Sequence, residues 1–189
     1  MLDLLPIRRG HFRYESRHHS DTWIDLERLC LKPEPARRLA DQLADRLANY
    51  DLDAVCGPLV EGAFIALMVA SRLQTLFTYA ERFDDRESDV LYPVKYRVPE
   101  SVRDELRGRR VAIVNDVISA GSAVRGTLAD LIDIGADTVV VASLAVLGRS
   151  FVEFAAANKL PLETLTHAPN NIWSPAECPM CAEGKALTP

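Results

Sequence analysis

The feature that most restricts the fold of this chain is a pair of continuous apolar runs on either side of a helical segment. Residues 109–116 (RRVAIVND) and 137–148 (DTVVVASLAVLG) are rich in β-branched residues and do not alternate between polar and apolar positions. Such runs are typical of strands that are covered on both faces. Between them, residues 123–135 have helical spacing and end at Gly135. We therefore predict an α/β fold with a parallel central sheet flanked by helices.

The remaining segments extend this alternation of strands and helices. Residues 34–50 carry an apolar stripe at helical spacing, and Pro35 suits a first helical turn. The polar and charged residues 83–95 have no period, which predicts a mobile loop. We expect further strands at 53–59, 75–81 and 162–168, and further helices at 62–73 and 150–160. Ligands of such sheets bind where the carboxyl ends of the strands open into loops, here residues 57–62, 115–123 and 148–150.

Composition limits the classes of function. The chain has 189 residues, of which 26% are charged and 48% hydrophobic, and a formal net charge of −5. This length fits one domain over 1–189, and the charged fraction argues against a disordered chain. The mild acidity argues against nucleic acid as a partner, and no apolar run is long enough for a membrane span. Without a signal peptide or a disulfide-rich pattern, we expect a soluble, cytoplasmic protein.

The segment 111–127 (VAIVNDVISAGSAVRGT) carries the clearest chemistry. A buried strand ends at Asn115 and Asp116, and the small residues 119–123 then lead into a helix. Backbone N–H groups of such a loop, together with the helix N-terminus, can bind a phosphate, while Asp116 can accept hydrogen bonds from sugar hydroxyls. An ordinary N-capped helix after a strand would give the same spacing, so the residues alone leave both interpretations open.

The order of residues in this loop resembles the signature that type I phosphoribosyltransferases use for phosphoribosyl pyrophosphate (PRPP). The resemblance extends over nearly the whole chain and is most specific for orotate phosphoribosyltransferases. Residues 10–26 are similar to their N-terminal segment, 55–73 to their pyrophosphate loop and the following helix, and 147–150 to their arginine-bearing strand end. Residues 174–187 (SPAECPMCAEGKAL) resemble the cysteine-containing tail of one bacterial branch. The family implies one domain with an N-terminal base-site and hood segment over 1–33 and a C-terminal tail over 169–189.

Members of this family transfer a phosphoribosyl group from PRPP to a base and release pyrophosphate with the help of Mg²⁺. By resemblance, Asp116 contacts the ribose hydroxyls and the loop 119–123 holds the 5′-phosphate. The implied PRPP-binding residues are Asn115, Asp116, Val117, Ile118, Ser119, Ala120, Gly121, Ser122 and Ala123. The implied pyrophosphate loop consists of Pro58, Leu59, Val60, Glu61 and Gly62.

The resemblance also implies contacts to the base and a closing loop. Arg149 would bind the carboxylate of orotate through its guanidinium, and Ser119 would lie beside the base. Residues 83–95 would form a flexible hood over the site. Alongside Asp116, the implied catalytic residues are Lys95 and Arg82. Related enzymes are dimers with shared active sites, so we expect a homodimer.

Several residues depart from the family pattern. Asn115 replaces the first acid of the PRPP signature, and Glu61 replaces a glycine of the pyrophosphate loop. A carboxylate beside pyrophosphate is repulsive unless a cation lies between them. The centre of the hood is acidic through residues 84–89, and Glu15 begins an altered stretch of the base segment. If the side chain of Glu61 points to solvent, its carboxylate does not repel the pyrophosphate.

Cysteines and histidines outside the PRPP loop suggest no further site. Cys178 and Cys181 have the spacing of a zinc knuckle, but no second CxxC exists, and we expect them to pack within the tail without binding a metal. The three histidines between His11 and His19 lie beside Arg13 and Arg17, which indicates either a cationic rim reaching a partner subunit or a solvated basic surface.

The leading hypothesis is a Mg²⁺-dependent enzyme that makes orotidine 5′-monophosphate from orotate and PRPP. A non-catalytic or regulatory paralogue that binds PRPP or a nucleotide is one alternative, favoured by Asn115, Glu61 and the acidic hood together. A phosphoribosyltransferase for a different base is the other. None of the three needs a nucleic-acid or membrane partner.

Overall fold

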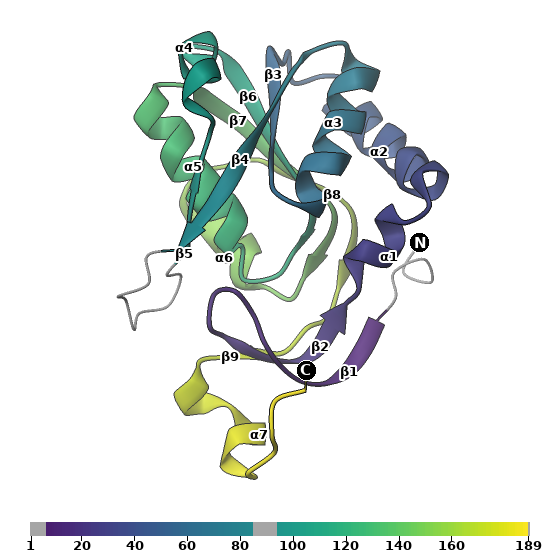
Figure 1. Ribbon diagram of the computed structural model, residues 1–189, viewed down its shortest axis with the longest axis vertical. Coiled ribbons are helices and arrows are strands. Elements are labelled where there is room, and N and C mark those ends of the chain that lie inside the picture. The colour runs from purple at the N-terminus through teal and green to yellow at the C-terminus, as the bar shows by residue number, and fades with distance from the viewer. Residues whose placement is uncertain (1–6, 85–93, 189) are drawn as a thin grey trace.

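A six-stranded sheet forms the centre of the molecule (Figure 1). The computed structural model describes residues 7–84 and 94–188. The strand order is β5-β4-β3-β6-β7-β8, and all neighbours are parallel except β4 and β5. The strands are β3 (Ala54–Pro58), β4 (Leu76–Asp84), β5 (Val94–Arg97), β6 (Arg110–Ile118), β7 (Asp137–Leu147) and β8 (Leu162–Ala168). The predicted α/β class with a parallel sheet flanked by helices is confirmed.

Helices cover both faces of this sheet. The two on one face are α2 (Pro33–Leu47), which follows the short α1 (Leu26–Cys30), and α3 (Glu61–Leu73). The other face is covered by α4 (Arg103–Leu106), α5 (Ser122–Ile134) and α6 (Ser150–Ala157), with the 3₁₀ turn η2 (Glu100–Val102) before α4. The stripe that α2 buries is the predicted one: Ala36, Leu39, Ala40, Leu43, Ala44 and Leu47.

The two faces explain the continuous apolar run of β6. Val114 packs into the core beneath α2 and α3, whereas its neighbour Ile113 packs into the core beneath α5. Successive side chains of a strand point to opposite faces. Since both faces are covered, the run 111–114 is apolar at every position, as the sequence predicts.

A second, smaller sheet lies beyond the edge at which β3 and β6 end (Figure 1). It is antiparallel and contains β1 (Ile7–Arg13), β2 (His19–Ile24) and β9 (Ile172–Trp173). The 3₁₀ turn η3 (Pro175–Glu177) and the helix α7 (Pro179–Ala182) follow β9. No strand is predicted over 1–33, because the apolar residues of this hairpin are few and its exposed positions vary.

Two expected boundaries were wrong. The segment 83–95 is not a loop throughout, because β4 continues to Asp84 and β5 begins at Val94; the central hood residues 85–93 lie outside the described residues. The helix expected over 150–160 ends at Ala157, where the side chain of Asn158 donates a hydrogen bond to the carbonyl of Phe154 at 2.8 Å. Within the described ranges, no helix has the length and apolar character needed to cross a membrane.

Candidate active site

A cavity of about 310 Å³ opens where β3 and β6 end, between the large sheet and the β1–β2 hairpin. Small-molecule sites commonly have volumes of about 300–1,000 Å³. Its lining includes every residue of 58–62 and of 115–123. The structure thus brings together the two loops that the sequence analysis assigned to pyrophosphate and PRPP. The third expected segment, 148–150, does not line the cavity.

The loop before α5 is shaped for close approach of a ligand to its backbone. Gly121 has φ of +82°, and a Cβ atom there would collide with the ring of buried Phe151. Only glycine meets both requirements without strain. Among the described residues, no side chain caps the N-terminus of α5, which begins at Ser122. The first N–H groups of this helix, whose dipole favours anions, therefore face the cavity as hydrogen-bond donors.

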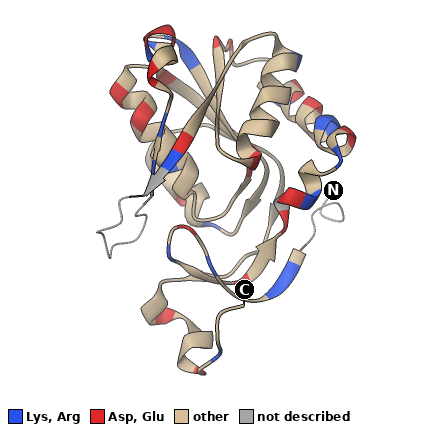
Figure 2. Cartoon of the chain, in the orientation of Figure 1, with Lys and Arg blue, Asp and Glu red and all other residues tan. Residues whose placement is uncertain are grey.

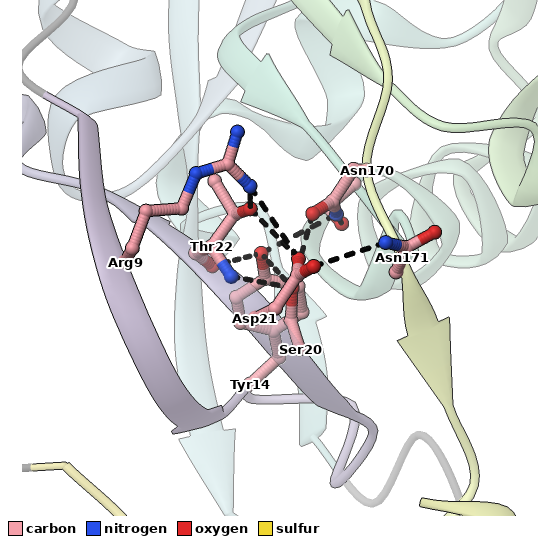
Figure 3. A network of polar contacts seen from close by, with 8 residues as sticks. Arg9, Tyr14, Ser20, Asp21, Thr22, Asn170 and Asn171 are labelled. Atoms are coloured by element: carbon pink, nitrogen blue, oxygen red, sulfur yellow. Dashed lines mark hydrogen bonds and ion pairs between the residues drawn. The ribbon is translucent and has the colours of Figure 1, made fainter. Parts of the chain in front are cut away.

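Ser119 is positioned by Asn170, a residue not predicted to belong to the site. Asn170, in the connection between β8 and β9, donates its Nδ2–H to Ser119 Oγ at 3.0 Å, and Ser20 Oγ donates to Asn170 Oδ1 at 3.0 Å. Because Ser119 Oγ accepts this hydrogen bond, its own hydroxyl proton is available to a ligand. Figure 3 shows how Asn170 and Asn171 reach the β2 residues Ser20 and Asp21, tying this connection to the hairpin.

Tyr14 belongs to the same network and lines the cavity. Its hydroxyl donates to the carbonyl of Thr22 at 2.6 Å and lies 3.4 Å from Asn170 Nδ2 (Figure 3). The hairpin wall of the cavity and the Ser119 loop are therefore held by one set of hydrogen bonds. A displacement of Asn170 would move both.

Asp116 lies at the end of β6 and is 6% exposed. Burial raises the pKa of its carboxyl to about 7, the N–H of Val117 opposes this with a 2.6 Å hydrogen bond, and the negative charge of Glu61 adds to the rise. Near neutral pH the group is therefore divided between its acid and carboxylate forms. A protonated carboxyl can donate a hydrogen bond to a vicinal diol, and a carboxylate can accept hydrogen bonds from it.

Asn115 joins the two loops rather than facing outward. Its Nδ2–H donates to the carbonyl of Val117 at 3.0 Å, and its Oδ1 lies where a Cβ atom on Gly62 would be. A carboxylate at 115 could not donate to that carbonyl. Asn115, which replaces the first acid of the PRPP signature, thus has a local structural role. Gly62, which lacks a Cβ atom, allows the start of α3 to pack against the Asn115 side chain.

Arg82 and Lys95, both predicted catalytic, lie on opposite sides of the β4–β5 pair. Arg82 pairs with Tyr96 in register, and both contact Glu15: the Tyr96 hydroxyl at 2.9 Å and the Arg82 guanidinium at 3.3 Å. Lys95 precedes Tyr96 and, by strand alternation, points the other way; it is exposed and does not line the cavity. The geometry places Arg82 beside the site, in a shallow hollow next to the cavity, and gives Lys95 no contact with it.

Arg149, predicted to bind the base, is also outside the cavity. It lies at the N-terminus of α6, where its guanidinium is 89% exposed and forms an ion pair with Glu153 at 3.4 Å. The position at the strand end is the expected one, but the side chain does not line the cavity. Its predicted role receives no support from this geometry.

The cavity is acidic. Glu15, Glu27, Glu61 and Asp116 line it, and none of the described lining residues is Lys, Arg or His. Figure 2 shows acidic positions on α1, at the start of α3 and on β4, the elements around this site. Glu61 is half-buried and lines the cavity. A highly charged anion can bind here only with a cation beside it.

The chain matches a known protein family. The phosphoribosyl transferase domain matches residues 33–173, which is most of the chain. The chain belongs to the phosphoribosyltransferase family. It is therefore a pentosyltransferase enzyme.

Individual relatives give more detail. The orotate phosphoribosyltransferase of Thermotoga maritima is 30% identical over 94% of this chain and 88% of its own length. Among solved structures, orotate phosphoribosyltransferase from Aeropyrum pernix has a TM-score of 0.64 at 23% identity, covering 85% of this chain and 87% of its own. Adenine phosphoribosyltransferase from Trypanosoma brucei has a TM-score of 0.69 at 19% identity, covering 87% of this chain and 76% of its own. The structural likenesses show the type I phosphoribosyltransferase fold alone.

Several lining residues of this phosphoribosyltransferase were missed or misjudged. Trp23 and Tyr96 were not predicted at the site, yet both line the cavity, and Trp23 is 37% exposed. His11 and His19 are buried, so they form neither a cationic rim nor a solvated surface. Polar and apolar residues do not alternate regularly over β1 and β2, so the local sequence gives no clear signal of this hairpin.

Proposed function

We propose that this phosphoribosyltransferase transfers the 5-phosphoribosyl group of PRPP to orotate, forming orotidine 5′-monophosphate and pyrophosphate. The observation that carries the choice of orotate is the 30% identity, over 94% of the chain, with a relative named orotate phosphoribosyltransferase. In this reaction the bond from the ribose C1′ to pyrophosphate breaks, and a bond from C1′ to a ring nitrogen of orotate forms while that nitrogen loses its proton. The main task of the protein is to hold the two substrates in line and to balance charge.

The chain's own groups support specific roles in this reaction. The N–H groups at the start of α5 and the hydroxyl of Ser119 donate to the 5′-phosphate. Asp116 hydrogen-bonds to the ribose hydroxyls and fixes C1′ between the loop 58–62 and the base. Tyr14 and Trp23 provide an aromatic wall on the hairpin side, against which a planar base can stack.

Mg²⁺ fits the donor groups of the cavity. The carboxylate of Glu61 lines it at the pyrophosphate loop, where no described lining residue supplies a positive charge. Mg²⁺ is held by one or two carboxylates together with substrate phosphates, so Glu61 and the pyrophosphate of PRPP form a suitable set. Mg²⁺ supplies neutralisation of the departing pyrophosphate when it is bound. This gives Glu61, a departure from the family pattern, a function.

A base panel tests the proposal. The full chain is mixed with Mg²⁺, PRPP and, in separate reactions, orotate, uracil, adenine, guanine and hypoxanthine, and released pyrophosphate is measured. Release with orotate alone is the expected result. Release with a purine and none with orotate would contradict the choice of base, and no release with any base would favour the regulatory paralogue.

A second candidate is transfer to a base without a carboxylate. The position of Arg149 outside the cavity favours it, because no described lining residue then offers a cation to a carboxylate of the base. Comparison of Arg149→Ala with wild type separates the two. For orotate as substrate, the loss of Arg149 raises KM for the base at least tenfold; for a neutral base it leaves KM unchanged.

Assembly and location remain predictions. We propose a homodimer in the cytoplasm, on the basis of the family resemblance. Sedimentation of the purified chain measures the oligomeric state, and a monomer at all concentrations would contradict the dimer.

A further inference from the structure

Four metal-binding side chains converge outside the active site, at the contact between the β1–β2 hairpin and the C-terminal segment. They are His11 of β1, His19 of β2, and Cys178 and Cys181 at either side of the start of α7. One ligand atom from each lies within 4.8 Å of all the others. His11, His19 and Cys178 are buried, whereas Cys181 is exposed. Figure 1 shows the C-terminal segment running below β1 and β2 and returning toward β1.

Four of the six separations between these atoms are close to those of a tetrahedral zinc site. His11 Nε2 lies 2.9 Å from His19 Nδ1 and 3.5 Å from Cys178 Sγ. Cys181 Sγ lies 3.7 Å from His11 Nε2 and 3.2 Å from His19 Nδ1. With zinc about 2.05 Å from nitrogen and about 2.3 Å from sulfur, a tetrahedron separates two nitrogens by about 3.3 Å and nitrogen from sulfur by about 3.6 Å. These four distances differ from the tetrahedral values by a few tenths of an ångström, and all four atoms lie within 4.8 Å of one another.

Hydrogen bonds alone do not satisfy this cluster. The other ring nitrogen of His11, Nδ1, lies 2.9 Å from the carbonyl oxygen of Lys185, which can only accept, so Nδ1 carries the proton. In the neutral ring, Nε2 then has one lone pair, yet three potential partners surround it. One lone pair accepts one hydrogen bond well, whereas a cation at the centre is contacted by all four atoms at once.

The contact between His11 and Lys185 is also the outer support that zinc-bound histidines usually have. A metal-binding imidazole generally donates its second N–H to a carbonyl or carboxylate, which fixes its tautomer and orientation. Two thiolates from Cys178 and Cys181 would balance the charge of Zn²⁺, so the site is neutral as a whole. The donor set of two thiolates and two imidazoles in a tetrahedron selects zinc among the common divalent ions.

We propose that His11, His19, Cys178 and Cys181 bind one structural zinc ion that fastens the C-terminal segment to the N-terminal hairpin. Four protein ligands leave no open position for substrate, so the role is structural rather than catalytic. The absence of a second CxxC predicts no metal here, but the other two ligands come from two neighbouring strands some 160 residues earlier in the chain.

The site has a consequence for the cavity. The hairpin that carries His11 and His19 also carries the lining residues Tyr14 and Ser16. The last described residue, Thr188, adds two hydrogen bonds to the backbone of His11, at 2.6 Å and 3.0 Å. Removing the metal therefore loosens the hairpin wall of the cavity without touching the loops 58–62 and 115–123.

Metal analysis of the full chain tests the proposal. Zinc per chain is measured by mass spectrometry of the purified protein after reconstitution with Zn²⁺ and removal of excess metal. We expect about one zinc per chain in wild type and in the matched control Cys30→Ser, whose thiol lies outside the cluster. Loss of a residue that only hydrogen-bonds to a metal ligand lowers metal affinity roughly 10- to 100-fold. We expect Cys178→Ser and Cys181→Ser, which each lose a ligand, to lower zinc affinity by more than this. Wild type without zinc, or cysteine variants with undiminished zinc, would overturn the proposal.

Thiol titration of wild type keeps the test independent of whether the variants fold. Cys181 is exposed, so without a metal its thiol reacts at once with a thiol reagent under native conditions. With zinc bound, Cys178 and Cys181 are protected, and a chelator releases two reactive thiols together with one zinc. A disulfide would release neither, and immediate reaction of Cys181 without chelator would show an unbound thiol; either result contradicts the site.

Discussion

Replacement of Asp116 by asparagine tests the account of the buried carboxyl. In the folded protein, burial holds the pKa of Asp116 near 7, compared with 3.8 for an exposed aspartate. Because folding raises this pKa, the group favours folding only while it is protonated. Its contribution to stability is greatest below pH 4 and is lost as pH rises from about 4 to about 7.

The magnitude follows from the two pKa values. A rise from 3.8 to about 7 corresponds to about 4 kcal/mol of lost stability at high pH. Between pH 5 and pH 8 the change is about 2–3 kcal/mol, or roughly 5–10 °C in Tm for a chain of this size. Asp116→Asn removes the ionisation but keeps an oxygen that can accept from the N–H of Val117. The free protein with asparagine should therefore become progressively more stable than wild type as pH rises.

Urea unfolding at pH 5 and pH 8, without substrate, measures the effect. The matched control is Asp130→Asn, because Asp130 is also buried but accepts from Arg103 at 2.9 Å and from the N–H of Val98 at 2.8 Å. This control should destabilise the protein at both pH values, by about 3 kcal/mol or less. A stability difference between Asp116→Asn and wild type that does not change with pH would refute the reasoning.

Three further predictions address the loops and the proposed metal. Gly121→Ala introduces a Cβ against Phe151 at positive φ and should lower the free energy of unfolding by more than the roughly 1 kcal/mol expected for Gly108→Ala, which also has positive φ but has open space; equal losses in urea unfolding would contradict the contact. Asn170→Ala removes the hydrogen bond to Ser119 and should raise KM for PRPP about tenfold in steady-state assays. The control Asn171→Ala removes only an exposed hydrogen bond to Asp21 and should leave KM for PRPP unchanged. Chelation of the metal should lower Tm and raise KM for the base more than KM for PRPP; an unchanged Tm in calorimetry would contradict a structural ion.

Much of the fold could be predicted from the sequence because both faces of the large sheet are covered. This makes β6 and β7 continuously apolar and gives α2 a clear stripe, so elements and class follow from local pattern. The ends of β4 and β5 could not be predicted, since their charged residues, including Glu81 and Arg82, are stabilised by pairing between the strands. Strand pairing between distant segments leaves little trace in the local sequence.

The same division applies to the site. The segments 58–62 and 115–123 begin within the ends of β3 and β6, so their convergence at one sheet edge follows from the topology. The contributions of Tyr96 and Asn170 depend on how separate parts of the chain meet, and no local signal indicates them. The convergence of His11 and His19 with Cys178 and Cys181 has the same origin: the ligands are split between the two ends of the chain.

The consumption of orotate in the presence of PRPP and Mg²⁺ tests the central claim most directly. Orotate and pyrophosphate are followed together for wild type and for Asp116→Ala. We expect wild type to consume one orotate for each pyrophosphate released, and Asp116→Ala to lower kcat/KM at least about 100-fold, equivalent to about 3 kcal/mol of transition-state stabilisation. No consumption by wild type, or an Asp116→Ala variant of near-normal activity, would contradict it.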